Sequence, residues 1–260
     1  MGYSEQQKSD SDSSQHLSPF TCFEPTYNHL SSDFIDMEIE LINISKSYQE
    51  GGRKHSILNE ISVRFPANRF SAILGKSGSG KSTLLNLISG IDTPDKGSIR
   101  IGNQMVNTMN DYQRTIFRRN RIGFVFQFFN LIPTLTVLEN VVLMSELDGN
   151  NADVSRNAAE QILSQVGLGN RLDATPDRLS GGEQQRTAIA RALVHNPDII
   201  LADEPTGNLD HDTGLKVLDL MLKLINEKGK TLVIATHSDE IQQLANHVFT
   251  ISSGKLDQLT

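Results

Sequence analysis

Nine residues between positions 75 and 83 have the composition of a loop that binds phosphate groups. Their sequence, GKSGSGKST, satisfies the pattern G-x-x-x-x-G-K-[ST]. In such loops glycines let backbone N–H groups surround the phosphates, a lysine reaches the β and γ phosphates, and a hydroxyl ligates Mg²⁺. An ordinary glycine-rich turn is the alternative, but the apolar segment FSAIL precedes the loop and the helical segment KSTLLNLIS follows it. The predicted binding residues are Gly75, Lys76, Ser77, Gly78, Ser79, Gly80, Lys81, Ser82 and Thr83, with Ser82 also a metal ligand.

An acidic pair, Asp203 and Glu204, follows another apolar segment, IILA. An aspartate at this point can hold Mg²⁺, mostly through water, and the adjacent glutamate can polarise a water molecule for attack on a γ-phosphate. Two acids can also simply end a strand. The phosphate-binding loop decides between these interpretations, and we predict Asp203 as a metal ligand and Glu204 as the catalytic base.

Two further polar residues follow apolar segments, Gln127 after IGFVF and His237 after TLVIAT. Single Gln or His residues are usually structural or exposed. Their positions at two further predicted strand ends favour a functional interpretation. Gln127 can contact both the metal ion and the attacking water, and His237 can donate a hydrogen bond to the γ-phosphate. We predict both as catalytic residues, and Gln127 also as a metal ligand.

The segment LSGGEQQR at residues 179–186 carries two adjacent glycines at the predicted start of a helix. Ser180 and Glu183 have the spacing of a capping box. A capping box needs neither Gly181 nor Gly182, and glycine is unfavourable inside a helix by about 1 kcal/mol relative to alanine. Glycines at a helix N-terminus let an anion approach free N–H groups at the positive end of the helix dipole. The segment therefore predicts contact with an anion that comes from elsewhere.

The elements that must position these residues follow from the apolar patterns. Alternating segments predict half-buried strands at 37–45 and 57–65, whereas continuous apolar runs predict strands covered on both faces at 70–74, 122–126, 198–203 and 231–236. Helical patterns lie between them at 81–89, about 153–166, 183–194 and 213–227. Buried parallel strands interleaved with helices indicate an α/β layered sheet, in which ligands bind beyond the carboxyl ends of the strands. The phosphate loop, the acidic pair, Gln127 and His237 all follow such ends.

Composition limits the partners and the location of the chain. At 260 residues, with a net charge of -7, it lacks the basic surface typical of nucleic-acid-binding proteins. The basic run RTIFRRNR is the exception and is interpreted as a solvated helix face, with a partner surface as the alternative. A single cysteine fits a reducing compartment, and no apolar run approaches the length of a membrane span. Residues 1–34 are rich in Ser, Asp, Gln and His and predict a disordered tail.

The order and spacing of these motifs resemble those of the ATP-binding cassette (ABC) ATPases. The phosphate loop, Gln127, LSGGEQQR, ILADEP, the NLD at 208–210 and His237 carry the likeness over about residues 37–255. It implies a P-loop NTPase fold at 35–260, with a mixed sheet core, an antiparallel β subdomain and a helical subdomain inserted at about 128–180. The segments FVFQFFNLIPTLTVLENV and LADEPTGNLD resemble the macrolide-export and lipoprotein-release branch.

This resemblance also implies how the site is completed. Two domains would face head to tail, so that Ser180, Gly181 and Gly182 contact the γ-phosphate of ATP bound by the other copy, and Asp210 crosses the same interface. Tyr48 matches the aromatic residue that stacks on adenine, although a tyrosine at a strand end is more often a packing residue. The family often has Asp directly after the histidine, whereas this chain has Ser238.

The function implied is an ATP hydrolase that uses ATP and Mg²⁺ to drive a separate transmembrane permease, in the export direction, from the cytoplasmic face of the inner membrane. A cell-division-type regulatory ATPase, which transmits conformational change without transport, is the alternative, since both need the same site. A DNA-linked cassette ATPase is disfavoured, because about 100 residues between the phosphate loop and LSGGEQQR leave no space for an inserted coiled coil or metal module.

Overall fold

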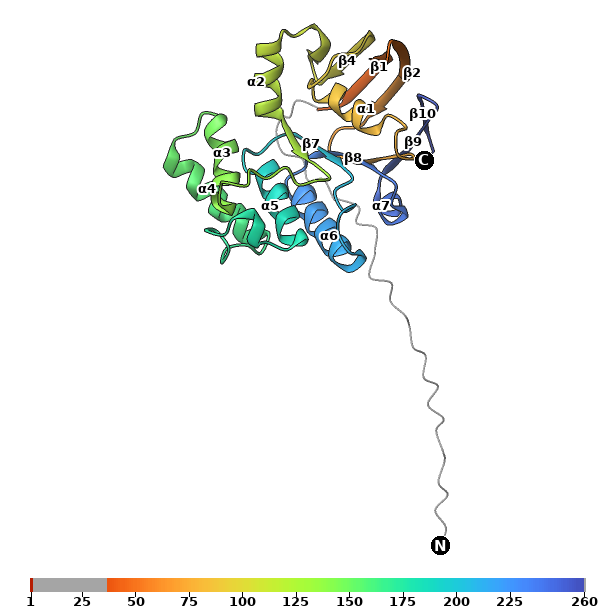
Figure 1. Cartoon of the computed structure of the whole chain (residues 1–260). Helices are drawn as coiled ribbons and strands as arrows, with labels where there is room; N and C mark the ends of the chain where they lie inside the picture. Colours follow the sequence, from red (N-terminus) through yellow and green to blue (C-terminus); the bar gives the residue numbers. More distant parts are fainter. Residues whose placement is uncertain (2–36, 260) are drawn as a thin grey trace. The chain divides into compact units, whose positions relative to one another are not determined.

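The computed structural model describes residue 1 and residues 37–259 (Figure 1). The tail predicted at residues 1–34 lies outside the described residues, apart from Met1, and so does the predicted domain boundary at residue 35. All the elements below belong to the unit Phe34–Thr260.

A six-stranded mixed sheet forms the centre of this unit. Its strand order is β10-β9-β3-β8-β7-β6, and every neighbouring pair is parallel except β9 with β10. The strands are β3 (Phe70–Leu74), β6 (Ile122–Val125), β7 (Ile199–Asp203), β8 (Thr231–Thr236), β9 (His247–Ser252) and β10 (Lys255–Gln258). Alternate residues of the central strands enter different apolar clusters: Ile200 and Ala202 lie in one, Ile199 and Leu201 in the other. Burial on both faces is the reason that these strands have continuous apolar sequences.

A second, antiparallel sheet packs over one of these clusters. Its order is β2-β1-β4-β5, formed by β1 (Ile39–Glu50), β2 (Arg53–Phe65), β4 (Lys96–Ile101) and β5 (Gln104–Met105). A short 3₁₀ helix, η1 (Val106–Thr108), follows β5. Apolar side chains of β1, β2 and β4 share a cluster with α1 (Lys81–Ile88) and with the outer face of the mixed sheet. Figure 1 shows α1 with β1, β2 and β4 on one side of the mixed sheet.

The other face of the mixed sheet is covered by helices. The cluster there contains apolar residues of α3 (Val137–Leu147), α4 (Ala152–Gln165), α5 (Gly181–Leu193) and α6 (His211–Glu227). The chain also has α2 (Asp111–Arg121), η2 (Pro176–Arg178) and α7 (Asp239–Leu244). Helices α3 and α4 pack on each other within the insertion predicted at about 128–180. The predicted fold class, an α/β cassette with a mixed sheet, an antiparallel sheet and inserted helices, is confirmed.

The basic run lies on α2, and most of its arginines have partners inside the chain. Arg114 pairs with Asp111, Arg118 donates to the carbonyl of Gly90 at 2.7 Å, and Arg121 pairs with Asp198 at 2.7 Å. Arg118 and Arg121 attach α2 to its neighbours, and Arg114 is paired within the helix, so the run does not form an open patch of free arginines.

Candidate nucleotide site

The phosphate-binding loop connects β3 to α1 and lines a cavity of about 720 Å³, a size suited to a nucleotide. Residues 76–83 all line it, and so do Tyr48, Ile57, Gln127, Asp203, Glu204 and His237. Gly78 and Gly80 have φ of 75° and 104°, which L side chains rarely adopt. Gly75 lies behind the wall of the cavity, where a Cβ would be 2.5 Å from Ser79 Oγ and 2.9 Å from the carbonyl oxygen of Ile251. Packing therefore requires glycine at 75, and backbone conformation favours it at 78 and 80.

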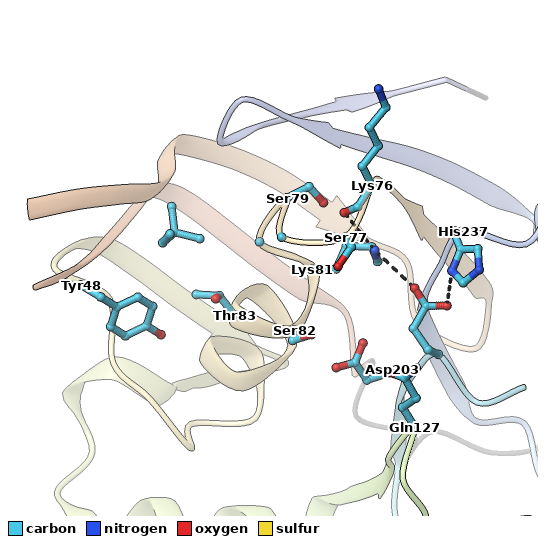
Figure 2. A pocket seen from close by; sticks show the side chains of 14 residues that line it. Tyr48, Lys76, Ser77, Ser79, Lys81, Ser82, Thr83, Gln127, Asp203 and His237 are labelled. Carbon is cyan, nitrogen blue, oxygen red and sulfur yellow. Dashed lines mark hydrogen bonds and ion pairs between the residues drawn. The ribbon is translucent and has the colours of Figure 1, made fainter. Parts of the chain in front are cut away.

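Lys81 is buried at the first position of α1 and lies against the loop that precedes it. Its Nζ donates to the carbonyl oxygens of Gly75 at 2.7 Å and Lys76 at 3.3 Å. It also forms an ion pair with Glu204 Oε1 at 3.3 Å (Figure 2). The ammonium group is thus directed into the cavity at the point where the loop and β7 meet.

Glu204 follows β7 and is held by four neighbours. Its φ of 46° is unusual for a residue with a side chain, and its N–H donates to the carbonyl of Ala235 at 2.8 Å. Besides Lys81, His237 Nδ1 lies 2.9 Å from Oε2, and Thr236 Oγ1 donates to the same oxygen at 3.2 Å. Backbone strain in a residue that its surroundings hold so firmly is typical of functional sites.

Asp203 ends β7 beside Ser82 and offers an oxygen ligand toward the loop. Burial raises the pKa of the Asp203 carboxyl, and a hydrogen bond from Ser82 opposes that rise. Gln127, which follows β6, lines the cavity on the same side, and Figure 2 shows it below Asp203. Among the described residues no group of three or more His, Cys, Asp or Glu could hold a metal ion. A hydroxyl, a carboxylate and an amide oxygen nevertheless fit Mg²⁺, which is usually bound by one or two carboxylates together with substrate phosphates and water.

Tyr48 lies near the end of β1 and forms the opposite end of the cavity from His237 (Figure 2). Tyr48 is 41% exposed, so it is not a buried packing residue. The hydroxyl donates to Asp92 Oδ2 at 2.7 Å. The ring therefore lies on the wall of the cavity in a defined orientation.

LSGGEQQR and Asp210 lie outside this cavity, as far as the described residues define its walls. Ser180 caps α5, and the capping box is complete: Ser180 N donates to Glu183 Oε2 at 2.9 Å, and Glu183 N donates to Ser180 Oγ at 3.3 Å. Asp210 caps α6 by accepting from Thr213 N at 3.0 Å. A Cβ on Gly182 would lie 2.6 Å from Thr213 Cγ2, so close packing of α5 on α6 requires this glycine. The sequence-based argument attributed Gly182 to an anion alone and missed this second reason.

Two contacts that hold residues 127–130 in place also escaped the sequence analysis. Asn208 Nδ2 donates to the backbone oxygen of Gln127 at 2.6 Å. Arg191, on α5, donates to the carbonyl oxygens of Phe129 at 2.7 Å and Asn130 at 2.5 Å, two residues with φ of 57° and 50°. Asn208 belongs to the NLD motif, which was a signal that the position mattered. Nothing in the local sequence distinguishes Arg191 from other helix-surface arginines.

Comparison with protein families matches residues 58–207 to the family described as ABC transporter. This chain belongs to that family. An uncharacterized ABC transporter ATP-binding protein of Mycobacterium tuberculosis (strain H37Rv) is 51% identical over 218 residues, which are 84% of this chain and 88% of that protein. The lipoprotein-releasing system ATP-binding protein LolD of Xanthomonas oryzae pv. oryzae (strain MAFF 311018) is 41% identical over 216 residues, covering 83% and 88%.

A solved structure gives the same result. The ATP-binding cassette MJ0796, in a dimeric post-hydrolysis state bound to ADP and Pi, matches with a TM-score of 0.79 and 40% identity, over 85% of this chain and 99% of that one. This ABC protein is therefore the ATP-binding subunit of a transporter and an ATP hydrolase. In the part of the chain that the structure describes, no helix combines the length and apolar character that crossing a membrane requires.

Proposed function

We propose that two copies of this chain meet head to tail, each ATP lying between the phosphate loop of one copy and residues 179–186 of the other. The observation that carries this proposal is a separation within one chain: Lys81, Glu204 and His237 share one cavity, and none of residues 179–186 lines it. The N-terminus of α5 is the positive end of the helix dipole, and its glycines let an anion approach the free N–H groups. The dimeric state reported for MJ0796 supports this arrangement.

In each site, different residues of the chain bind different parts of ATP. Tyr48 stacks on adenine, the backbone of residues 76–83 surrounds the phosphates, and Lys81 contacts the β and γ phosphates. Ser82, Gln127 and Asp203 would hold Mg²⁺, and the ion would supply positive charge that stabilises the charge developing on the phosphate oxygens. The ion pair between Lys81 and Glu204 keeps both side chains directed at the γ-phosphate end of the cavity.

Hydrolysis needs a base, a hydrogen-bond donor and stabilisation of the transferred group. Glu204 accepts a proton from water as the water oxygen bonds to the γ-phosphorus. The bond from that phosphorus to the β–γ bridging oxygen breaks, leaving ADP and phosphate. His237, 2.9 Å from Glu204, donates a hydrogen bond to the γ-phosphate. Ser180, Gly181 and Gly182 of the other copy contact that phosphate where its charge develops, and Asp210 crosses the interface beside them.

Hydrolysis in this pair drives a separate transmembrane permease, in the export direction that the macrolide-export and lipoprotein-release branch suggests. The chain then lies on the cytoplasmic face of the inner membrane, bound to that permease. We expect a tagged copy to co-purify from detergent-solubilised membranes with one integral-membrane protein. Recovery of the chain without any membrane protein would contradict the permease partner.

Mixing two inactive variants tests the head-to-tail pair directly. Lys81→Ala removes the phosphate contact in the copy that binds ATP, and Ser180→Arg blocks the contact supplied to the other copy. A mixed dimer has one site with both defects and one with neither, so mixing should restore roughly a quarter of wild-type activity at equal concentrations. If each site were complete within one chain, the mixture would stay as inactive as its components.

A further inference from the structure

A cluster behind Tyr48 contains two charged side chains that hydrolysis does not use. Lys46 lies two residues before Tyr48 on β1, and Asp92 lies in the turn between α1 and β4. The Lys46 side chain is 10% exposed, which is unusual for a lysine. A buried ammonium group needs partners that compensate for its lost hydration, and the identity of those partners indicates what the group does.

Lys46 and Asp92 are joined to each other and to the Tyr48 ring. Lys46 Nζ lies 2.6 Å from Asp92 Oδ1 and donates to the carbonyl oxygen of Thr93 at 2.8 Å. The same Nζ is 5.1 Å from the centroid of the Tyr48 ring, within the range of a cation–π contact. The other oxygen of Asp92 accepts the Tyr48 hydroxyl at 2.7 Å. The phenol is thus held at its hydroxyl by a carboxylate and over one face by an ammonium group.

The turn that carries Asp92 is itself fixed to β1. Asp95 N donates to the carbonyl of Ser45 at 2.8 Å, and Ser47 N donates to Asp95 Oδ2 at 2.9 Å. Burial alone would raise the pKa of Asp92, but hydrogen bonds from its three donors outweigh that effect and hold the pKa below its ordinary value. Asp92 is therefore ionised at neutral pH, and its carboxylate accepts hydrogen bonds from both Lys46 and Tyr48.

This geometry leaves one face of the ring for a ligand. Because Lys46 lies over the first face, a base can stack only on the second, and the hydroxyl bond stops the ring from turning away. We propose that Asp92 and Lys46 are positioning residues of the nucleotide site, which hold the Tyr48 ring in the orientation on which adenine stacks. The inference rests on the proposed role of Tyr48 in the function above.

Binding of two ligands separates ring positioning from general stability. ATP contacts both the ring and the phosphate loop, whereas inorganic tripolyphosphate contacts the loop alone. Removing the hydroxyl anchor in Tyr48→Phe or its acceptor in Asp92→Asn should weaken ATP binding about three- to ten-fold. The same variants should leave the Kd of tripolyphosphate unchanged. Calorimetric titration of the wild type and both variants with each ligand gives the six Kd values.

Glu40→Gln is the matched control, because Glu40 is an acidic residue of the same strand β1 that pairs with Arg64 and Arg100 and does not line the cavity. It should leave both Kd values at the wild-type level. The Tyr48→Phe and Asp92→Asn effects should also be non-additive in the double variant, since each removes the same bond. If Asp92→Asn does not fold, Tyr48→Phe alone decides.

The outcomes distinguish this inference from the proposed function. Unchanged ATP binding in Tyr48→Phe, or equal weakening of both ligands in Asp92→Asn, would overturn the positioning role. A Tyr48→Ala variant that binds ATP as tightly as the wild type would instead contradict the stacking role of Tyr48, on which the inference depends.

Discussion

The cavity around Lys81 and the helix ends around Ser180 differ in what they leave for another molecule. In the cavity, charged side chains from distant segments converge: Lys81 contacts Glu204, and Glu204 contacts His237. At the helix ends, Ser180 and Asp210 have their side chains engaged as caps of α5 and α6 in their own chain. The first region brings the candidate catalytic side chains together in one cavity, whereas in the second the carboxylates of Glu183 and Asp210 are engaged as helix caps. A motif can therefore be as recognisable in sequence as the cavity residues and yet lie apart from them in the chain, as residues 179–186 do.

The largest effect is expected from the base. Glu204→Gln keeps the size of the side chain and removes its ability to accept a proton, so kcat should fall about 10²–10⁴-fold while ATP still binds. Steady-state hydrolysis together with nucleotide titration checks this. A variant that hydrolyses ATP like the wild type would remove Glu204 from its assigned role.

At the helix ends, the role of Gly182 in packing can be separated from its proposed role in contacting a ligand. Gly182→Ala brings a methyl group against Thr213 and should lower the free energy of unfolding by about 1–3 kcal/mol. Adding Thr213→Ser removes the opposing methyl and should restore stability, as measured by denaturant unfolding.

Activity of that double variant then sharpens the comparison. If the backbone at 182 also contacts a γ-phosphate, hydrolysis stays impaired although stability has returned. Full recovery of both would mean that Gly182 serves packing alone.

A smaller effect is expected where the two regions are linked. Asn208, next to the cap residues of α6, donates to the backbone oxygen of Gln127 in the cavity. Asn208→Ala should lower kcat about three- to ten-fold by releasing Gln127, with little change in unfolding temperature because only one hydrogen bond is lost. An unchanged kcat would show that Gln127 is positioned without this link.

The smallest effect concerns stability against pH. Because burial raises the pKa of Asp203, the folded protein disfavours its charged form, and this cost is present above the ordinary carboxyl range and absent below it. Asp203→Asn should therefore raise the unfolding temperature at pH 7 by about 1–3 °C. The difference from the wild type should shrink as the pH falls toward 4. A constant difference across this range would contradict a raised pKa.

Sequence patterns located most strands and helices, and their failures have physical causes. The strand predicted at 37–45 continues to Glu50 as β1, because register shifts between Ile44 and Ser47 interrupt the alternation of side chains. Helix α3 was not predicted, since its apolar residues cover several faces in the core formed with α4 and α5. The edge strand β10 has the polar sequence KLDQ and is defined only by its pairing with β9.

The sequence by itself determined the candidate site: a phosphate-binding loop, an acidic pair, Gln127 and His237, each following an apolar strand. These features are local, because consecutive residues define both a nine-residue motif and the apolar pattern of a five-residue strand. Only the tertiary structure decided what supports them: the contact of Asn208 with Gln127, of Lys46 and Asp92 with Tyr48, and of Gly182 with Thr213. Such contacts join segments far apart in the chain, and their partners are chosen by the order of the strands and the close packing of the helices.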